Sequence, residues 1–337
     1  MKSNSLPCMV RVIGFRGFLK VACISCFRKF GRLVDSNRFD IVHTFFEDSI
    51  FFAYFGSYFA RSRPRFISSR RDIGLGAGNH PWYHGIYRRL LPLINTRYDY
   101  VIANSHVVKE YACQRERLSG EKVKVIYNGV EVPDGDAHEK PSIFRNQPHS
   151  TIWICIVASL TPVKRHDLIV RAISHISDRC LGLPPVRVLL LGEGPQEKEI
   201  SRLAKKLGVL DTIDFVGAVD NVGHYLQNCD IGVLCSDREG LSNAILEYMS
   251  YKLPVIATRT GGNTELVTNE TGRCVPVGDA QAIADALVSL IEDPITRHEL
   301  GLAGYRRVAA DFSWTSAIEN IQAFYDLVLD SDRNTGS

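Results

Sequence analysis

The sequence lacks any apolar run long enough to cross a membrane. Among its 337 residues the nearest to one is Ile50–Ala60, well short of the roughly 18 residues of a spanning helix, so a buried or surface-adsorbed helix is expected there. The N-terminus also lacks the basic, apolar and small-residue order of a secretory signal. These two absences predict a cytoplasmic location.

Paired cysteines are missing as well. The nine cysteines are an odd number at scattered positions, which favours reduced thiols over a disulfide framework. Cys23 and Cys26 form a lone CxxC without a second pair at ligand spacing, so we expect no zinc site. Asp330 and Asp332 form a DxD in the polar tail, where a solvated chain end is the simpler interpretation.

Charge is unevenly shared along the chain, although the net charge is only +3. Residues 1–148 carry 23 Lys and Arg against 13 Asp and Glu, whereas residues 149–337 carry 17 against 24. This asymmetry predicts an anionic partner for the first half: a membrane surface, a phosphorylated lipid or a nucleic acid. The basic residues lack the interleaved aromatic module of nucleic-acid readers, so we expect no nucleic acid and favour the membrane surface.

Short apolar runs alternate with helical spacing along the whole chain, which predicts an α/β protein with parallel sheets. The helical spacing is clear at Leu168, Ala172 and Ile176. The expected strands are Val10–Gly14, Asp40–Thr44, Arg65–Ser69, Tyr100–Asn104, Val123–Tyr127, Ile152–Ala158, Val186–Leu191, Ile213–Gly217, Ile231–Cys235 and Val255–Thr258.

A polar stretch with three prolines, Glu131–Ser150, separates two such halves and is typical of an interdomain linker. The predicted organisation is a Rossmann-like domain at 1–140, a linker at 141–150, a second such domain at 151–312, a C-terminal helix at 313–330 and a frayed tail at 331–337. Two doubly wound domains would face each other across a cleft, because open parallel sheets bind ligands at the carboxyl ends of their strands. That arrangement suits a two-substrate transferase.

Candidate site residues are densest in Asp230–Glu265. A buried strand is followed there by a polar loop and by Ser242, which suits the N-cap of a helix. The free N–H groups of that helix would bind an anion such as a diphosphate, and Gly240 would let the backbone approach it closely. Glu239 and Glu247 can border one pocket, where carboxylates bind sugar hydroxyls. A solvated Glu247 is the alternative.

A second candidate group follows the first strand of the second half. Lys164 lies in the loop after that strand, where a compact ammonium can neutralise a leaving phosphate, unless it is only a solvated loop lysine. Gly192 lies in the small-residue loop that ends the next strand at the same edge.

These segments resemble, in order, the donor-binding domain of the retaining glycosyltransferases of family 4, which have the GT-B fold. The match runs through ASLTPVKRHD, LLLGEGPQ, FVGAVDNV, CDIGVLCSDREGLSNAILEYMSYKLPVIATRTGGNTELV, TGRCVPVGD and FSW. Glu239 and Glu247 correspond to the E-x7-E motif of the family. The resemblance implies that Glu239 contacts the donor sugar and Glu247 the ribose of the nucleotide.

The resemblance implies roles for neighbouring residues too. Backbone donors to the diphosphate would come from Gly240, Leu241 and Ser242. Lys164 would bind the same group, and the base would lie near Val216. Ser159 stands where the family often has arginine, so the diphosphate charge would rest more on Lys164 and the helix N-terminus, or on Arg165.

The first half matches the family through RFDIVHTFFEDS, RFISSRRDIGLG, DYVIANSHVVKEYA and VKVIYNGVEVP. On this acceptor side, the residues expected to face the cleft are Arg70, Arg71, Asp72, Asn104 and Ser105. The opening strand and glycine-rich loop of the family are not seen before this point, so residues 1–39 are expected to begin partway through the first domain. The glycine run at 74–79 resembles a dinucleotide fingerprint, but its last position is asparagine and no strand leads into it, which argues against nicotinamide binding.

The resulting prediction is a retaining, metal-independent hexosyltransferase without a cofactor. It would use a UDP- or GDP-sugar and act on a glycan or lipid-linked acceptor in cell-surface polysaccharide or glycolipid synthesis, in the cytoplasm and on the inner face of the membrane. The alternatives are a non-catalytic sugar-nucleotide-binding subunit or truncated, inactive homologue, and a GT-B sugar-nucleotide epimerase.

Overall fold

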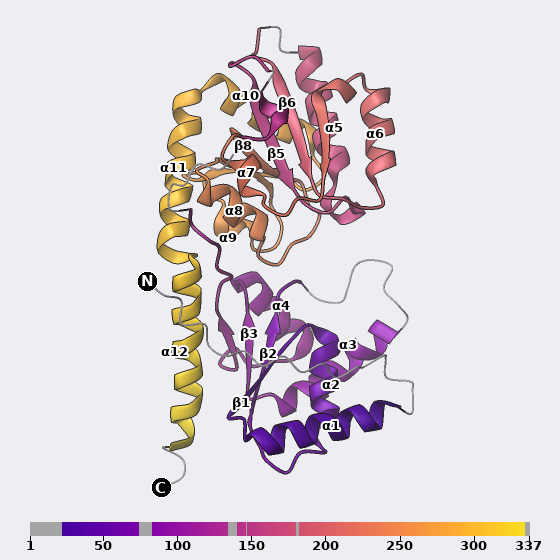
Figure 1. Cartoon of the computed structure of the whole chain (residues 1–337), viewed down its shortest axis with the longest axis vertical. Coiled ribbons are helices and arrows are strands. Elements are labelled where there is room, and N and C mark those ends of the chain that lie inside the picture. The colour runs from indigo at the N-terminus through magenta and orange to yellow at the C-terminus, as the bar shows by residue number, and fades with distance from the viewer. Residues whose placement is uncertain (1–21, 74–82, 134–139, 146, 180–181, 334–337) are drawn as a thin grey trace.

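The computed structural model describes residues 22–73, 83–133, 140–145, 147–179 and 182–333 (Figure 1). Its described strands form two parallel sheets, one of four strands and one of six. The helices are α1 (Ala22–Asn37), α2 (Glu47–Ser57), α3 (Tyr83–Ile94), α4 (His106–Glu116), α5 (His166–Arg179), α6 (Glu197–Lys206), α7 (Gly223–Leu226), α8 (Asn243–Ser250), α9 (Asn263–Leu266), α10 (Ala280–Glu292), α11 (Pro294–Asp311) and α12 (Trp314–Arg333).

The first sheet has the strand order β1-β2-β3-β4. Its strands are β1 (Ile41–Phe45), β2 (Arg65–Arg70), β3 (Tyr100–Ala103) and β4 (Val123–Val125). Neighbouring residues of β2 point to opposite faces of the sheet, as the strand geometry requires. Phe66 packs with Ile50 of α2 and Ile94 of α3, whereas Ile67 packs with Val328 of α12. Helices therefore cover both faces, with α12 along one side (Figure 1).

The aromatic side of α1 is used for packing inside the first domain. The rings of Phe27 and Phe52 lie 5.4 Å apart, and those of Phe30 and Phe52 lie 5.5 Å apart, so α1 packs on α2. Burying an aromatic or aliphatic side chain of this size contributes about 1.5–3 kcal/mol. Phe27 and Phe30 of α1 are therefore used for packing within the first domain.

The second sheet has the strand order β10-β9-β8-β5-β6-β7. Its strands are β5 (Ile152–Val157), β6 (Val186–Leu191), β7 (Ile213–Gly217), β8 (Ile231–Leu234), β9 (Val255–Thr258) and β10 (Gly272–Val275). The order reverses beside β5, which has β6 on one side and β8 on the other. Ligands bind beyond the carboxyl ends of strands at such a switch point. The loops after β5 and β8 are therefore where a site is expected.

The chain crosses between the domains twice. It passes from β4 towards β5 through residues 126–151, and α12 runs back from the second domain along the first sheet (Figure 1). The crossings are tied together, because the Val130 N–H donates to Phe312 O at 2.9 Å and the Trp314 N–H donates to Val130 O at 2.9 Å. His43 of β1 adds a hydrogen bond to the Tyr325 hydroxyl of α12 at 2.7 Å.

The strand predictions from Asp40 onward are confirmed to within two residues at each end, whereas Val10–Gly14 lies outside the described residues. Strand β10 was not expected as a strand. The polar stretch 131–150 is not wholly exposed, because Phe144 is buried with its ring 4.6 Å from that of Trp153. The domain boundaries stay predictions. Within the described part of the chain, no helix has the length and apolar character needed to span a bilayer.

Candidate functional site

The loops after β5 and β8 bring together the two residues expected to be catalytic. Lys164 ends a single turn of 3-10 helix, Pro162–Lys164, and its ammonium lies 2.6 Å from Glu239 Oε1. Both side chains are largely buried, with 23% of Lys164 and 11% of Glu239 exposed. The backbone supports this contact, because the Asp237 N–H donates to Val163 O at 2.9 Å. A cation is thus fixed at the switch point by an adjacent carboxylate.

Arg165 and Ser159 are placed less favourably for a diphosphate. The Arg165 guanidinium bonds Asp167 and Asp237, each at 2.9 Å, and these carboxylates raise its pKa. Arg165 is therefore shared between two carboxylates, whereas Lys164 contacts one, that of Glu239. Ser159 is exposed, and its Oγ lies 3.4 Å from Thr161 Oγ1. Lys164 remains the better-placed cation of this loop.

The N-terminus of α8 follows Gly240, as expected, but its capping differs from the prediction. Ser242 holds the N-cap position, yet its side chain makes no capping hydrogen bond, so the prediction is right in position only. Leu241 is 5% exposed and packs in the core, which leaves its backbone as the part that could meet a ligand. The N–H groups at the start of α8 can therefore still bind an anion.

Close backbone contacts explain the glycines at this edge. A Cβ on Gly240 would lie 2.1 Å from Arg71 O in the first domain, a distance that no side chain tolerates. Gly261 has φ +50, a left-handed backbone that favours glycine, and a Cβ there would lie 1.9 Å from Glu239 O. The two domains are therefore in backbone contact next to Glu239.

Glu247 lines a pocket of about 550 Å3 between α8 and residues 129–133, where the chain crosses from the first domain to the second. The pocket is bordered by Gly129, Val130, Glu131, Val132, Pro133, Asn221, Val222, Gly223, Asn243, Glu247, Ser250, Tyr251 and Trp314. Burial raises the pKa of Glu247 above its usual value, so this is not the solvated helix carboxylate of the alternative interpretation. Glu239 is not among these lining residues and instead contacts Lys164. The two carboxylates thus serve different parts of the cleft.

Gly192 and Val216 belong to the same edge. The Gly192 N–H donates to Gly217 O at 2.8 Å, which joins the ends of β6 and β7. Val216 is partly buried in β7, against the core cluster that also holds Leu241 and Leu246. Their predicted contacts with a ligand stay predictions.

On the first domain, Arg70 is among the residues that line a pocket at the end of the first sheet, but its guanidinium is paired inside the domain. Arg70 is 5% exposed, and its Nη2 lies 2.8 Å from Glu116 Oε2. Further hydrogen bonds join the guanidinium to Ser68 at 3.1 Å and Asn95 at 3.0 Å. The positive charge is thus matched inside the domain, and Arg70 holds together β2, α4 and the 3-10 turn Asn95–Arg97 that follows α3.

The other acceptor-side residues lie where the first sheet ends. Arg71 and Asn104 line a second pocket of about 230 Å3, which also includes Trp314 and Asn128. Arg71 donates to Asn128 Oδ1 at 3.1 Å. Asn104 Nδ2 donates to Arg71 O at 3.1 Å, while its buried Oδ1 has no hydrogen-bond partner among the described residues.

Asp72 and Ser105 complete the acceptor-side set. Asp72 is exposed, and its Cα would lie 2.9 Å from a Cβ on Gly240. Ser105 is fully buried and is not free for an acceptor, because its Oγ caps α4 by accepting from the Val108 N–H at 3.1 Å. Ser105 was expected to face the cleft, and its Cβ would lie 3.1 Å from a Cβ on Gly262 of the second domain, but its hydroxyl is engaged by its own helix.

Several site residues were missed by sequence reasoning. Asn243 Oδ1 accepts from Asn128 Nδ2 at 2.8 Å across the domains, and Trp314 borders both pockets. Glu265 contacts the first domain through His106 and Val107. Glu265 follows the Gly261–Gly262 pair closely in the sequence, but its partner Val107 lies 158 residues away. Only the fold brings the two together.

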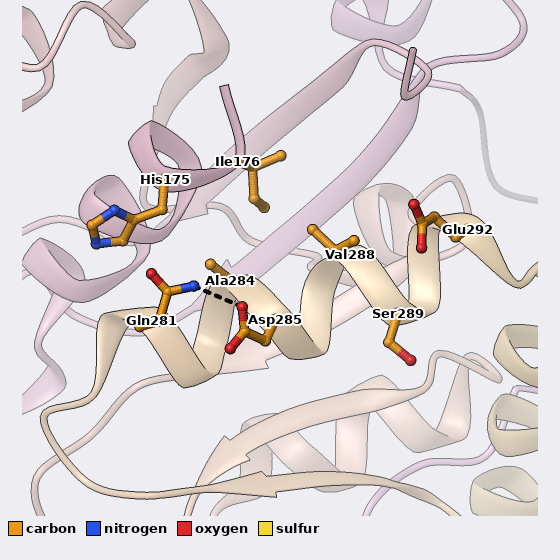
Figure 2. A pocket seen from close by; sticks show the side chains of 8 residues that line it. All are labelled: His175, Ile176, Gln281, Ala284, Asp285, Val288, Ser289 and Glu292. Carbon is orange, nitrogen blue, oxygen red and sulfur yellow. Dashed lines mark hydrogen bonds between the residues drawn. The ribbon is translucent and has the colours of Figure 1, made fainter. Parts of the chain in front are cut away.

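A further hollow lies far from the strand ends. Figure 2 shows it between α5 and α10, with His175 and Ile176 on α5 and the remaining lining residues on α10. It measures about 320 Å3, and Gln281 donates to Asp285 along α10 at 2.6 Å. This is an outer groove between helices and not part of the cleft. Among the described residues, no cluster of His, Cys, Asp and Glu is arranged to hold a metal ion.

Two Rossmann-like domains in contact at the carboxyl ends of their sheets define a protein of the GT-B fold class. The family model described as "Glycosyl transferases group 1" matches residues 140–307, and that described as "Glycosyltransferase Family 4" matches residues 9–133. The chain belongs to this family of glycosyltransferases. The fold class and the family resemblance expected from the sequence are thus confirmed.

The chain is similar to the N-acetyl-alpha-D-glucosaminyl L-malate synthase of Bacillus anthracis, with 30% identity over 53% of this chain and 46% of that protein. It is also 31% identical to a GDP-mannose-dependent phosphatidylinositol monomannoside mannosyltransferase of Corynebacterium glutamicum, over 49% of this chain and 44% of that one. The matched stretch thus spans about half the length of these relatives.

Solved structures share the fold at low identity. HepE of Anabaena, solved with UDP, aligns with a TM-score of 0.77 and 21% identity, covering 90% of this chain and 82% of that one. Sucrose-phosphate synthase of Thermosynechococcus elongatus aligns with a TM-score of 0.79 and 22% identity, covering 92% and 80%.

Proposed function

We propose that the protein is a retaining glycosyltransferase that moves a hexosyl unit from a UDP- or GDP-sugar to an acceptor hydroxyl. The observation that carries this proposal is the Lys164–Glu239 contact at the switch point beside the pocket lined by Glu247. The acceptor would be a glycan or lipid-linked sugar, as in cell-surface polysaccharide or glycolipid synthesis. UDP in the HepE structure and GDP-mannose in the name of the Corynebacterium relative support these donor classes.

In the proposed reaction, the bond from the anomeric carbon to the diphosphate oxygen breaks and a bond to the acceptor oxygen forms on the same face. The acceptor proton passes to the departing phosphate oxygen. Lys164 and the N–H groups at the start of α8 stabilise the charge that develops there. Glu239 holds hydroxyls of the donor sugar, and Glu247 holds the ribose. These cationic and dipolar groups would let the enzyme work without a metal or cofactor.

Residues at the edge of the first domain support a role in binding the acceptor. Arg71, Asp72 and Asn104 lie at the edge that faces the donor loops, and we propose that they position the acceptor.

The excess of basic residues in 1–148 supports peripheral attachment of a cytoplasmic protein to the anionic inner face of a membrane. Co-sedimentation with phosphatidylglycerol vesicles that weakens with added salt is the expected result, and binding that is equal on neutral vesicles would contradict it.

A panel of nucleotide sugars tests the donor assignment. Saturating donor should raise the unfolding temperature, because a ligand at 100 times its Kd stabilises the native state by about 2.7 kcal/mol. Glu247→Gln should reduce the shift, whereas the matched change Glu292→Gln on the outer groove should leave it intact. Donor binding without any transfer or hydrolysis would favour the non-catalytic subunit instead. Loss of donor without a product joined to an acceptor would favour an epimerase.

A further inference from the structure

A single carboxylate of the second domain caps a helix of the first domain. Glu265 lies on α9, directly after the Gly261–Gly262 loop. Its Oε2 accepts from the His106 N–H at 3.0 Å, and its Oε1 accepts from the Val107 N–H at 2.9 Å. The Tyr127 hydroxyl, also of the first domain, donates to Oε2 at 3.1 Å.

The capping of α4 is shared between the two domains. The first turn of a helix leaves its N–H groups without partners inside the helix. Ser105, the local N-cap, serves only the third of them by accepting from Val108. The first two, on His106 and Val107, are served by Glu265. A carboxylate at this end of a helix makes charge-assisted hydrogen bonds and also interacts favourably with the helix dipole.

Glu265 is held firmly on its own side of the contact. Arg307 of α11 donates to Glu265 O at 2.6 Å, and the Glu265 N–H donates to Gly262 O at 3.0 Å. The Gly262 N–H in turn donates to Gly240 O. Glu265 is thus connected through two successive backbone hydrogen bonds to Gly240, in the loop that follows Glu239.

We propose that Glu265 is a positioning residue that holds the two domains closed over the donor by capping α4. The inference rests on the proposed function for the step that closure serves. Closure would align the acceptor with the donor sugar and exclude water, and donor bound at the loop after Glu239 would favour the closed arrangement through Gly240 and Gly262. Glu265 itself does not touch the reacting atoms.

The test compares Glu265→Gln, which keeps the shape but loses the charge, with Glu265→Ala. The matched control is Glu270→Gln, a neighbouring exposed carboxylate. Both Glu265 variants should enlarge the radius of gyration in solution scattering and speed amide exchange in the peptide that holds residues 105–109. The transfer rate should fall roughly tenfold for Glu265→Ala, equivalent to one lost charge-assisted cap, while the donor Kd changes less than threefold.

The pattern of these readouts separates closure from other roles. Unchanged scattering and exchange in both variants would overturn the proposal, and so would a donor Kd that weakens as much as the rate, since that would make Glu265 a donor ligand. Tyr127→Phe, which removes one donor but leaves the cap, should give a smaller change in exchange than Glu265→Ala. If the wild-type protein binds no nucleotide sugar, the proposed function fails. Scattering and amide exchange would still show whether Glu265 holds the two domains together.

Discussion

The ammonium of Lys164 and the carboxylate of Glu239 lie 2.6 Å apart although they come from loops after two different strands, β5 and β8. The contact places one cation at the reversal of strand order and neutralises it. A donor diphosphate that binds Lys164 would compete with Glu239 for the ammonium group. Donor binding is therefore expected to alter this ion pair.

Removal of the ammonium should therefore affect catalysis more than folding. Lys164→Ala is expected to lower the transfer rate by about 10²–10³, because one fixed charge at a developing oxyanion is worth that much. Lys198→Ala, an exposed lysine on α6, is the matched control and should keep full activity. Steady-state assays of released nucleotide measure both, and an equally active Lys164→Ala variant would remove Lys164 from the mechanism.

Glu247 should make donor binding sensitive to acid. Burial raises the pKa of its carboxyl, and the ionised form accepts hydrogen bonds from ribose hydroxyls more strongly than the protonated form does. Donor affinity is expected to fall as the pH drops through a pKa above the usual value near 4.5, and Glu247→Gln should have lost this dependence. Calorimetric titration with UDP between pH 4 and pH 8 gives the profile. A flat wild-type profile over that range would contradict the assignment.

Because its pKa is raised, the ionised carboxylate of Glu247 destabilises the folded protein at neutral pH. The folded protein binds the proton more tightly than the unfolded chain, so the destabilisation is absent below the unfolded pKa and complete above the folded one. Glu247→Gln should therefore unfold at a higher temperature than the wild type at pH 7 and at an equal temperature near pH 3. Thermal unfolding in the absence of donor measures this, and a lower unfolding temperature at pH 7 would refute it.

Local pattern carried most of the fold. Strands of a parallel sheet are covered on both faces, so their sequences are mostly apolar and do not alternate with polar residues. This pattern predicted β6 with the bounds that the structure has, Val186–Leu191. The short strand β10 escaped notice because Gly272–Val275 contains a glycine and an arginine. The Lys164–Glu239 contact could be anticipated, since loops after adjacent strands must meet at one edge.

Roles that depend on distant partners could not be read from the sequence. Arg70 follows a strand just as Arg71 does, but its partner Glu116 comes 46 residues later, on a helix whose placement only packing decides. Ser105 was expected in the cleft for the same reason, while its own helix already uses its hydroxyl. Spacing along a chain predicts which edge a residue reaches, and not whether its polar atoms are still free there.

Arg70 and Glu116 should accordingly matter for stability rather than for acceptor recognition. Removing one member leaves the other charge buried and unpaired, so Arg70→Ala and Glu116→Ala should each cost about 3–5 kcal/mol of the free energy of unfolding. The double variant Arg70→Ala with Glu116→Ala should lose less stability than the sum of the two single changes, because no charge is left unpaired. Urea denaturation followed by the tyrosine and tryptophan signal measures the three values, and additive losses in the double variant would contradict a coupled pair.

His166 should control how the second domain responds to acid. Its ring is 2% exposed, neither ring nitrogen has a hydrogen-bond partner among the described residues, and burial, with the charge of Lys164 adding to it, lowers its pKa to about 4. The unfolded chain binds the proton more readily, so stability falls as the pH drops from about 6.5 to about 4, by on the order of 3 kcal/mol for this one group. His166→Leu keeps the site filled without a titrating ring and should flatten the loss over that range, whereas the exposed His298→Gln should not. Urea midpoints recorded at pH 7, 5.5 and 4.5 give the comparison, and parallel curves for the wild type and His166→Leu would show that this ring is protonated in the folded protein as easily as in the unfolded one.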